Sequence, residues 1–328
     1  MTEEQLAQRR RFAGETVPSM HRRSDSHDYT SRSFYMITLI VEGRRPLLGQ
    51  LRGSENDAGI VLTPLGEEVA RSWQAISTFH PDVAVIAQQV MPDHFHGILY
   101  FRKNVPGLHL GYVIRGFKTA TNRAYRQLVA PCEYATTLSQ PTGKGLLWEK
   151  GYNDRILHTY QTLDRWKDYL RDNPRRLLVK RLHPDLFRVQ HNLQYGGLTF
   201  SAIGNRFLLN RPLKIQVQCS RRITDEELKQ QRAAMLAAGA EGAVFVSPCI
   251  SKGEKMIMHD VFEAGYPVIY LQENGFTDMA KPGGRRFDAC SRGQMLILAP
   301  WVHHNEHVTI SRSQCMVLND MARILCES

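Results

Sequence analysis

The segment from Met91 to Tyr100 constrains the fold more than any other part of this chain. Apolar runs over 83–90 and 94–101 flank Met91-Pro92-Asp93, which predicts two strands joined by a tight turn. Side chains alternate along a strand, so His94 and His96 project from the same face. Two imidazoles on one face suit a divalent metal. One histidine in the core and one at the surface would give the same spacing.

Apolar periodicity divides the rest of the first half into strands and helices. We expect a first strand over 34–41 and a short second strand over 47–51 that pairs with it. Amphipathic helices are predicted from Pro64 onward and over 110–128. A further helix is predicted over 162–172, ending before Pro174 because proline disfavours the helical conformation of the residue before it.

Positive charge is concentrated in the first part of the chain. The formal net charge is +10, and residues 1–200 carry 27 lysines and arginines against 19 acidic residues. Such a surplus favours a polyanion as partner. We expect residues 1–30 to form a flexible basic arm, and the polar face of the helix over 110–128 to contact phosphates, although a solvated face has the same pattern. The residues predicted to contact DNA are Arg115, Lys118, Asn122, Arg126, Arg175 and Arg176.

Tyr169 and Asn173 stand four residues apart at the end of the helix over 162–172, so they share a face. A tyrosine oxygen is a poor nucleophile at neutral pH because its pKa is about 10. It becomes useful when a metal polarises a phosphodiester. Asn173 offers an oxygen that could complete a site with His94 and His96 for Mg²⁺ or Mn²⁺. Packing on the sheet and capping the helix end are the structural alternatives for these two residues.

Several short motifs follow one another in order between residues 28 and 181. They are Asp28-Tyr29-Thr30, Phe34-Tyr35-Met36-Ile37-Thr38, Leu65-Gly66-Glu67, Val90-Met91-Pro92-Asp93-His94-Phe95-His96-Gly97-Ile98, Gly151-Tyr152-Asn153-Asp154-Arg155 and Tyr169-Leu170-Arg171-Asp172-Asn173-Pro174. In this order they resemble the REP-associated tyrosine transposases, a branch of the single-tyrosine HUH transposases. The H-hydrophobe-H strand and the Tyr-x-x-x-Asn-Pro helix end are the most specific of these motifs.

The resemblance implies a ferredoxin-like α+β domain over residues 31–189 that cleaves single-stranded DNA, often beside a hairpin. His94 and His96 would hold the metal together with Asn173. Tyr169 would attack the scissile phosphate, which leaves a 5′-phosphotyrosine and a free 3′-hydroxyl.

Three features depart from that pattern or compete with it. Tyr152 and Tyr160 are alternative nucleophiles, although neither sits in the matching helix motif. Asp93 stands where many relatives of the family carry asparagine. The chain also continues to Ser328, well past the point near residue 185 where such a domain ends.

The character of the sequence changes after about residue 190. Gly196-Gly197 suggests a boundary, so we expect a linker over 190–210 and a second domain over 211–328. Four apolar runs alternate with helical segments there, which favours a Rossmann-like α/β domain with a parallel sheet. The four predicted strand runs are Leu213–Cys219, Ala243–Ile250, Pro267–Leu271 and Met295–Pro300.

Small residues at the predicted strand ends suggest a phosphate or nucleotide site in the second domain. Ser220, Arg221, Ser251 and Gly253 carry a limited resemblance to the DNA-processing protein A family. A capping pattern at Thr224-Asp225-Glu226-Glu227 argues against an anion at that helix start. The histidines at 303, 304 and 307 suggest either a metal cluster or a solvated loop.

These features predict a metal-dependent single-strand DNA endonuclease and strand transferase that binds single-stranded or hairpin DNA. The alternatives are a catalytically silent hairpin-binding protein with a regulatory nucleotide-binding second domain, or a second domain that is itself the enzyme. No apolar run approaches the ~20 residues of a membrane span. We therefore expect a cytoplasmic protein without a membrane partner, for which a homodimer is one assembly to test.

Overall fold

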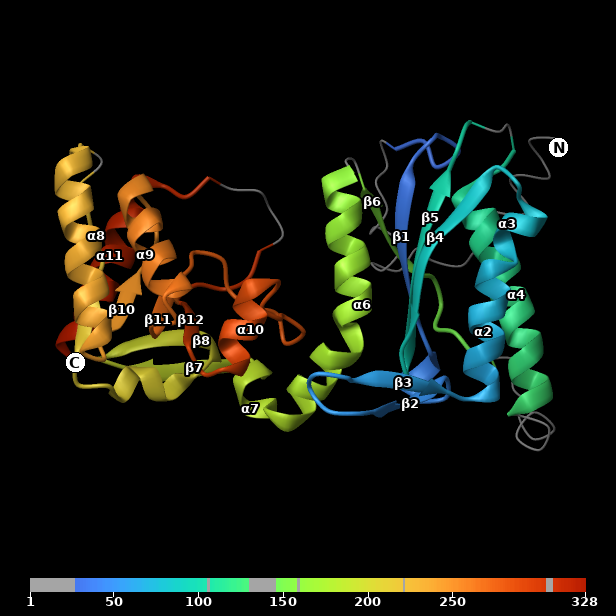
Figure 1. The fold of residues 1–328 in the computed structure, drawn as a ribbon, viewed down its shortest axis with the longest axis horizontal. Coiled ribbons are helices and arrows are strands. Elements are labelled where there is room, and N and C mark those ends of the chain that lie inside the picture. The colour runs from blue at the N-terminus through green and yellow to red at the C-terminus, as the bar shows by residue number, and fades with distance from the viewer. Residues whose placement is uncertain (1–26, 105–106, 130–145, 158–159, 221, 305–308) are drawn as a thin grey trace. The chain divides into compact units, whose positions relative to one another are not determined.

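The computed structural model describes residues 27–104, 107–129, 146–157, 160–220, 222–304 and 309–328. The chain divides into two compact units, Met1–Leu178 and Val179–Ser328 (Figure 1). Each unit has hydrophobic cores of its own. The division falls inside a long helix rather than near residue 190, where the sequence predicted it.

The first unit is built on a four-stranded antiparallel sheet in the order β4-β5-β1-β6. β5 pairs with β4 on one side and with β1 on the other, so it is an interior strand. The predicted strands over 83–90 and 94–101 and the turn between them are confirmed. The bounds of the strands are β1 Phe34–Ile40, β4 Val83–Val90, β5 His94–Phe101 and β6 Asn153–Leu157.

Helices cover both faces of this sheet. Phe95 and Leu99 of β5 face a core that includes Trp73 and Phe117, from the helices on one side. Ile98 of β5 faces a smaller core that includes Leu170, from the helix on the other side. In Figure 1 the helices α2 and α4 lie on one side of β5 and β1, and α6 lies on the other. The bounds of the helices are α2 Pro64–Gln74, α3 Ile76–Phe79, α4 Leu110–Leu128 and α6 Tyr160–Leu182.

Two local predictions in the first unit are wrong. The second strand, β2 (Gly49–Arg52), pairs with β3 (Gly59–Leu62) in a separate two-stranded sheet and not with β1; a short turn, η2 (Glu42–Arg44), follows β1. The end of the predicted flexible arm is part of the core, because Tyr29 is buried and its hydroxyl donates to Asp154 Oδ2 at 2.9 Å. Residues 1–26 of the arm lie outside the described residues.

The helix α6 continues through Pro174 to Leu182, whereas the sequence predicted an end at residue 172. A proline inside a helix removes one N–H donor and costs about 3 kcal/mol. Leu163 and Leu170 pack against the sheet, and Pro174 is itself buried. The packing of this helix on the sheet therefore outweighs the local cost of Pro174.

The second unit contains a six-stranded mixed sheet in the order β7-β8-β12-β11-β10-β9. The strands β9 to β12 run parallel, and each predicted strand run of this region contains one of them. The helices α8, α9 and α10 contribute to the core on one face of the sheet, and α11 contributes to the core on the other. Their bounds are β9 Lys214–Gln216, α8 Asp225–Ala240, β10 Val244–Ser247, α9 Lys252–Glu263, β11 Val268–Leu271, α10 Arg285–Ser291, β12 Met295–Ala299 and α11 Arg312–Glu327.

The predicted linker over 190–210 is instead a β-hairpin that belongs to this sheet. β7 (Gln190–Tyr195) pairs with β8 (Leu198–Gly204), and β8 pairs antiparallel with β12. Gly196 and Gly197 form the two-residue turn with φ of 57° and 74°, a backbone that glycine adopts without strain. The glycine pair therefore marks a turn and not a boundary. Short helical segments flank the hairpin, α7 (Pro184–Phe187) before it and η3 (Arg206–Asn210) after it.

Within the described residues, no helix is both long enough and apolar enough to cross a membrane.

The helix α2 packs so closely on β5 at Gly97 that there is no room for a side chain. A Cβ added there would lie 2.3 Å from Trp73 Cζ2, a distance that forces the ring to move. We expect Gly97→Ala to lower the free energy of unfolding of the first unit by about 1–3 kcal/mol, as overpacking does in a dense core. Gly116→Ala is the matched control, because a Cβ there meets nothing within 4 Å. A denaturant titration in which Gly97→Ala is no less stable than the parent would contradict this packing.

Candidate active site

The two histidines of β5 lie together on the face of the sheet that α6 covers. Their ring centroids are 4.8 Å apart and the rings are nearly perpendicular. His96 is buried and His94 is half-buried. The same-face prediction made from strand periodicity is confirmed by this ring contact.

Each histidine has its Nδ1 atom engaged by a neighbouring oxygen. His94 Nδ1 donates to Asp93 Oδ1 at 2.6 Å, and His96 Nδ1 shares a hydrogen bond of 2.8 Å with Thr38 Oγ1. Thr38 can reach His96 because the two residues are paired across β1 and β5. The Nε2 atoms are therefore the ring nitrogens left to bind a ligand. An oxygen partner on the second nitrogen is the usual arrangement of a metal-binding histidine.

Electrostatics keep these groups in defined protonation states. Burial by itself raises the pKa of Asp93, but the hydrogen bond and charge of His94, together with Arg44, outweigh burial and bring that pKa to about 2. Burial, and then the neighbouring His94, lower the pKa of His96 to about 3. At neutral pH the His96 ring is therefore neutral, which is the form that binds metals.

Tyr169 of α6 lies against this histidine pair. Its ring centroid is 6.1 Å from that of His96, in an edge-on arrangement. Asn173 follows one helical turn later, is buried at 8% exposure, and has a side-chain nitrogen without a hydrogen-bond partner. Residues four apart on a helix share a face, so the Tyr169 face of α6 includes Asn173.

Two further residues on α6 surround the tyrosine. The Arg176 guanidinium lies 5.5 Å from the centroid of the Tyr169 ring, and Trp166 packs edge-on against the same ring at 5.2 Å. Arg176 is buried at 8% exposure. The sequence predicted a helix end before Pro174, which placed Arg176 beyond the helix, so its position beside Tyr169 was missed. Its spacing of seven residues from Tyr169 would have revealed it if α6 had been extended through Pro174.

Two observations indicate that His94, His96 and Asn173 fit a divalent metal. Both histidines have Nε2 atoms left to bind, and the Asn173 amide is buried with one atom unpaired. Because amide oxygen and nitrogen are assigned from hydrogen bonds alone, the oxygen can occupy the unpaired position. Within the described residues, no group of three histidine, cysteine, aspartate or glutamate side chains could hold a metal ion. A metal at the histidine pair would therefore need the Asn173 amide as a third ligand.

Tyr152 lies elsewhere. It packs against the core on the α2 and α4 face, opposite the histidines. The side chain of the other alternative, Tyr160, lies outside the described residues.

The helix α4, predicted to contact DNA, covers the face of the sheet opposite the histidines. Lys118 donates through Nζ to the backbone oxygens of Glu149 and Gly151 at 2.8 and 2.9 Å, and burial lowers its pKa to about 8. Asn122 Oδ1 accepts from the backbone N–H of Leu147 at 2.8 Å. Both side chains therefore hold the segment that leads into β6.

The remaining predicted DNA contacts differ in exposure. Arg115 and Arg126 are exposed on α4. Arg175 makes two hydrogen bonds to Asp172, at 2.6 and 3.0 Å, and so is partly neutralised. Contact of these three arginines with DNA stays a prediction, whereas Arg176 lies at the tyrosine itself.

The predicted phosphate site of the second unit is occupied by helix capping. Ser251 caps α9 by accepting from the backbone N–H of Glu254 at 3.1 Å, and the buried Glu254 carboxylate accepts from the backbone N–H of Ile250 at 2.7 Å. A carboxylate at a helix start satisfies the donors that an anion would need. Gly253 is required by packing, since a Cβ there would lie 2.4 Å from Cys219 Sγ.

Ser220 and Arg221 complete that predicted site. Ser220 Oγ accepts from the backbone N–H of Arg222 at 3.1 Å, and Arg221 lies outside the described residues. The Ser251-x-x-Glu254 pattern is visible in the sequence and could have excluded an anion at this helix start.

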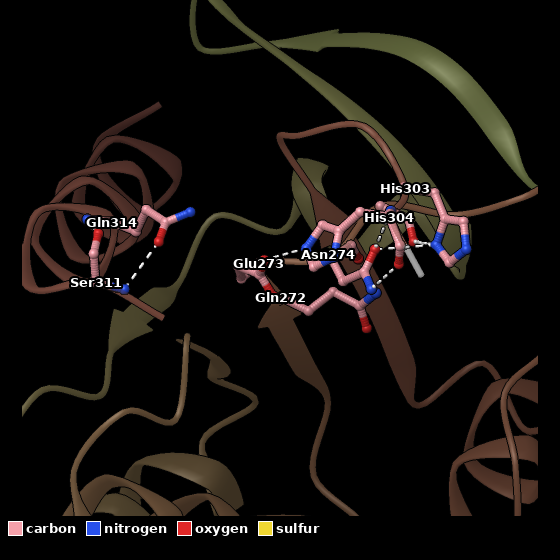
Figure 2. Close-up of polar contacts among 8 residues, drawn as sticks. Gln272, Glu273, Asn274, His303, His304, Ser311 and Gln314 are labelled. Atoms are coloured by element: carbon pink, nitrogen blue, oxygen red, sulfur yellow. Dashed lines mark hydrogen bonds and ion pairs between the residues drawn. The ribbon is translucent and has the colours of Figure 1, made fainter. Parts of the chain in front are cut away.

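The histidines at 303 and 304 face oxygen atoms of the loop after β11. His304 Nε2 lies 2.5 Å from Glu273 Oε1, and Asn274 binds both the N–H and the C=O of His304 at 3.0 and 2.9 Å (Figure 2). His303 Nδ1 is 3.0 Å from Asn274 Oδ1. These contacts join the loops that follow two adjacent parallel strands. His307, the third histidine of the suggested metal cluster, lies outside the described residues.

Comparison with known proteins gives one sequence relative and several distant structures. No family model matches the chain. An uncharacterized protein of Haemophilus influenzae is 24% identical over 163 residues, which cover 47% of this chain and 88% of the relative.

Two of the similar structures process or bind DNA. A REP-associated tyrosine transposase bound to a REP hairpin has a TM-score of 0.32 and 14% identity, over 46% of this chain and 72% of its own. DNA processing protein A from Helicobacter pylori, described for its single-stranded DNA binding, has a TM-score of 0.32 and 16% identity, over 43% of this chain and 66% of its own. At these TM-scores neither likeness carries an argument. The functional assignment therefore rests on the site.

The hydrogen bond between Thr38 and His96 gives a test of whether the histidine pair binds a metal. We expect Thr38→Val to weaken Mn²⁺ binding by about 10- to 100-fold, because it removes the partner that orients the ring. Isothermal titration calorimetry with MnCl₂ measures this change, and Thr119→Val, on the exposed face of α4, is the control. An unchanged Mn²⁺ affinity in Thr38→Val would show that this ring does not bind the metal in the orientation seen here.

Proposed function

We propose that the first unit is a metal-dependent single-stranded DNA endonuclease and strand transferase with Tyr169 as its nucleophile. One observation carries the proposal: the Tyr169 ring lies against His96, the buried member of a histidine pair whose Nδ1 atoms are both engaged. A structural tyrosine needs no such neighbours. A nucleophile that attacks a phosphodiester needs an electrophilic centre held beside it.

The proposed reaction exchanges one phosphate ester for another. The Tyr169 oxygen bonds to the scissile phosphorus, and its proton passes to water. The bond between phosphorus and the 3′ oxygen breaks, and that oxygen takes a proton from water to become a free 3′-hydroxyl. The 5′ end is left as a phosphotyrosine ester, so the cut strand can be rejoined by the reverse attack of a 3′-hydroxyl.

The protein residues divide the remaining tasks. His94, His96 and Asn173 would hold Mg²⁺ or Mn²⁺, which supplies Lewis-acid polarisation of the scissile phosphate when bound. Thr38 and Asp93 orient the two imidazoles. Donors preorganised beside developing charge contribute strongly to catalysis in water-poor sites.

Arg176 would supply such a charge at the attacked phosphate. It is buried, and its guanidinium lies 5.5 Å from the centroid of the Tyr169 ring. A guanidinium matches phosphate oxygens in both charge and geometry.

The arrangement of elements supports the proposed fold relationships. In the first unit the sheet order β4-β5-β1-β6, with α2 and α4 on one face, supports a ferredoxin-like assignment. In the second, the parallel strands β9 to β12 with helices on both faces support a Rossmann-like assignment. Single-stranded or hairpin DNA is the proposed substrate, and a homodimer stays a prediction.

Covalent capture tests the nucleophile. We expect the full chain, incubated with 5′- or 3′-labelled single-stranded hairpin DNA and Mn²⁺, to give a denaturation-resistant adduct only with the label on the 3′ side of the cut. Tyr169→Phe should abolish the adduct because it removes the attacking oxygen. Tyr112→Phe, on the exposed surface of α4, should leave the adduct unchanged. An adduct that persists in Tyr169→Phe and disappears in Tyr152→Phe would assign the chemistry to the other tyrosine.

Arg176 gives an independent test of the same site. We expect Arg176→Gln to reduce the single-turnover cleavage rate on the order of 100-fold, as loss of a preorganised donor does. Hairpin binding should weaken far less, and Arg176→Lys should recover part of the rate because it retains the charge. Arg171→Gln is the matched control, since Arg171 is exposed on the same helix and is paired with Asp168. Equal losses in both variants, or a loss of binding that accounts for the whole effect, would remove Arg176 from the site.

A further inference from the structure

A cavity of about 620 Å³ opens in the second unit where the parallel strands β10 and β11 end. Pro248 and Cys249 line it just after β10, and Tyr270, Gln272 and Glu273 line it at the end of β11. The carboxyl ends of parallel strands are where open α/β sheets bind ligands. The volume lies within the range of about 300–1,000 Å³ that small-molecule sites occupy.

The charges around this cavity leave two cations unmatched. Glu263 is paired with Arg285, and Glu273 is paired with His304. Among the described residues, neither Lys255 nor Arg286 is paired with a carboxylate, and both line the cavity. The local balance therefore favours an anionic ligand.

Arg286 is placed to bind an anion through its edge. Its guanidinium lies 5.2 Å from the centroid of the Tyr270 ring. A guanidinium held over a ring keeps its N–H groups directed outward, where they match the oxygen atoms of a phosphate. Burial raises the pKa of the Cys249 thiol to about 12 and raises that of Tyr270 as well, so neither group competes as an anion.

Apolar residues form another part of the lining, and a phosphate ion alone would leave most of the cavity unfilled. Phe262, Leu271, Ile310 and Leu318 form part of the wall. Apolar and aromatic side chains of this kind pack against the flat faces of bases. The cavity thus combines a basic edge with a wall that suits a planar ring.

Glu273 adds a group of the kind that recognises sugars. Its Oε1 atom is engaged by His304, which leaves lone pairs on the carboxylate for hydroxyl donors. A carboxylate at the end of a neighbouring strand is the standard partner of ribose hydroxyls in dinucleotide-binding sheets. Asn274 fixes the loop by its two bonds to His304 (Figure 2).

The backbone is strained at Cys249, one of the residues that line the cavity. Cys249 has φ of +52°, a left-handed conformation that costs a non-glycine residue energy. Its N–H donates to Ser247 Oγ at 3.0 Å, and Ser247 Oγ in turn donates to the backbone oxygen of Val217 at 2.8 Å. Side-chain hydrogen bonds therefore hold this turn at the end of β10, where Cys249 lines the cavity.

We infer that this cavity binds a nucleoside monophosphate, with Arg286 and Lys255 at the phosphate, Glu273 at the ribose and the apolar wall at the base. The site differs from the phosphate site predicted at Ser251, where Glu254 already fills the helix start. The inference is independent of the nuclease chemistry proposed for the first unit.

Isothermal titration calorimetry on the full chain tests the inference, with AMP, GMP, CMP and UMP as probes and inorganic phosphate and adenosine as partial ligands. We expect at least one nucleotide to bind with one site per chain, and more tightly than either partial ligand. Arg286→Gln should weaken binding by about 10- to 100-fold, the loss expected for charged hydrogen bonds. Arg222→Gln, an exposed arginine outside the lining, should leave it unchanged.

Two further readouts separate this site from other sources of binding. A carboxylate that binds the ribose hydroxyls should make the parent bind AMP more tightly than dAMP, and Glu273→Gln should reduce that difference in affinity. Lys255→Gln should weaken the binding of nucleotides without affecting the binding of adenosine. Tyr169→Phe should leave nucleotide binding intact, because Tyr169 belongs to the first unit and does not line the cavity. The nucleotide result therefore does not depend on the nuclease proposal. The inference would be overturned if none of the four nucleotides bound, or if Arg286→Gln bound nucleotides as tightly as the parent. It would also be overturned if only single-stranded oligonucleotides bound.

Discussion

The first unit depends on β5 being an interior strand with both of its faces covered. Hydrogen bonds to β4 and β1 fix its register, and period-two alternation then sends Phe95 and Leu99 into one core and His96 and Ile98 towards the other face. A shift of one residue would exchange the two sets. The apolar residues on one side therefore hold the histidines on the other.

Because α6 covers the histidine face, the same packing brings Tyr169 to the histidine pair. Leu163 and Leu170 anchor the helix on the sheet through Met36 and Ile98. Their positions along the helix set the rotation that turns Tyr169 towards His96. Apolar packing and the two oxygen partners of the imidazole rings thus hold the polar residues of the site in place.

Much of the first unit could be predicted because its elements have strong local patterns. The strands β4 and β5 and the helix α4 begin and end as expected, since alternation and helical spacing are visible over eight or more residues. What failed depends on tertiary context. The packing of α6 outweighs the proline, so the sequence hid the place of Arg176, and no local pattern shows that α4 covers the face opposite the histidines.

In the second unit the parallel strands were predictable and the ligand site was not. Strand–helix alternation identifies β9 to β12, but a Gly-Gly pair marks a turn and a boundary equally well, and only pairing with β12 decides between them. Cavity-lining residues such as Lys255, Tyr270 and Arg286 come from separate elements. Residues so far apart in the chain form no motif that a single sequence reveals.

The attachment point of the DNA tests the central claim most directly. Trapped covalent adduct is digested with a protease and a nuclease, and the nucleotide-bearing peptide is sequenced by tandem mass spectrometry. The arrangement of β5 and α6 predicts a phosphate ester on Tyr169, on the 5′ side of the retained nucleotide. A nucleotide on Tyr152 or Tyr160, or no nucleotide-bearing peptide from a cleaving preparation, would contradict it.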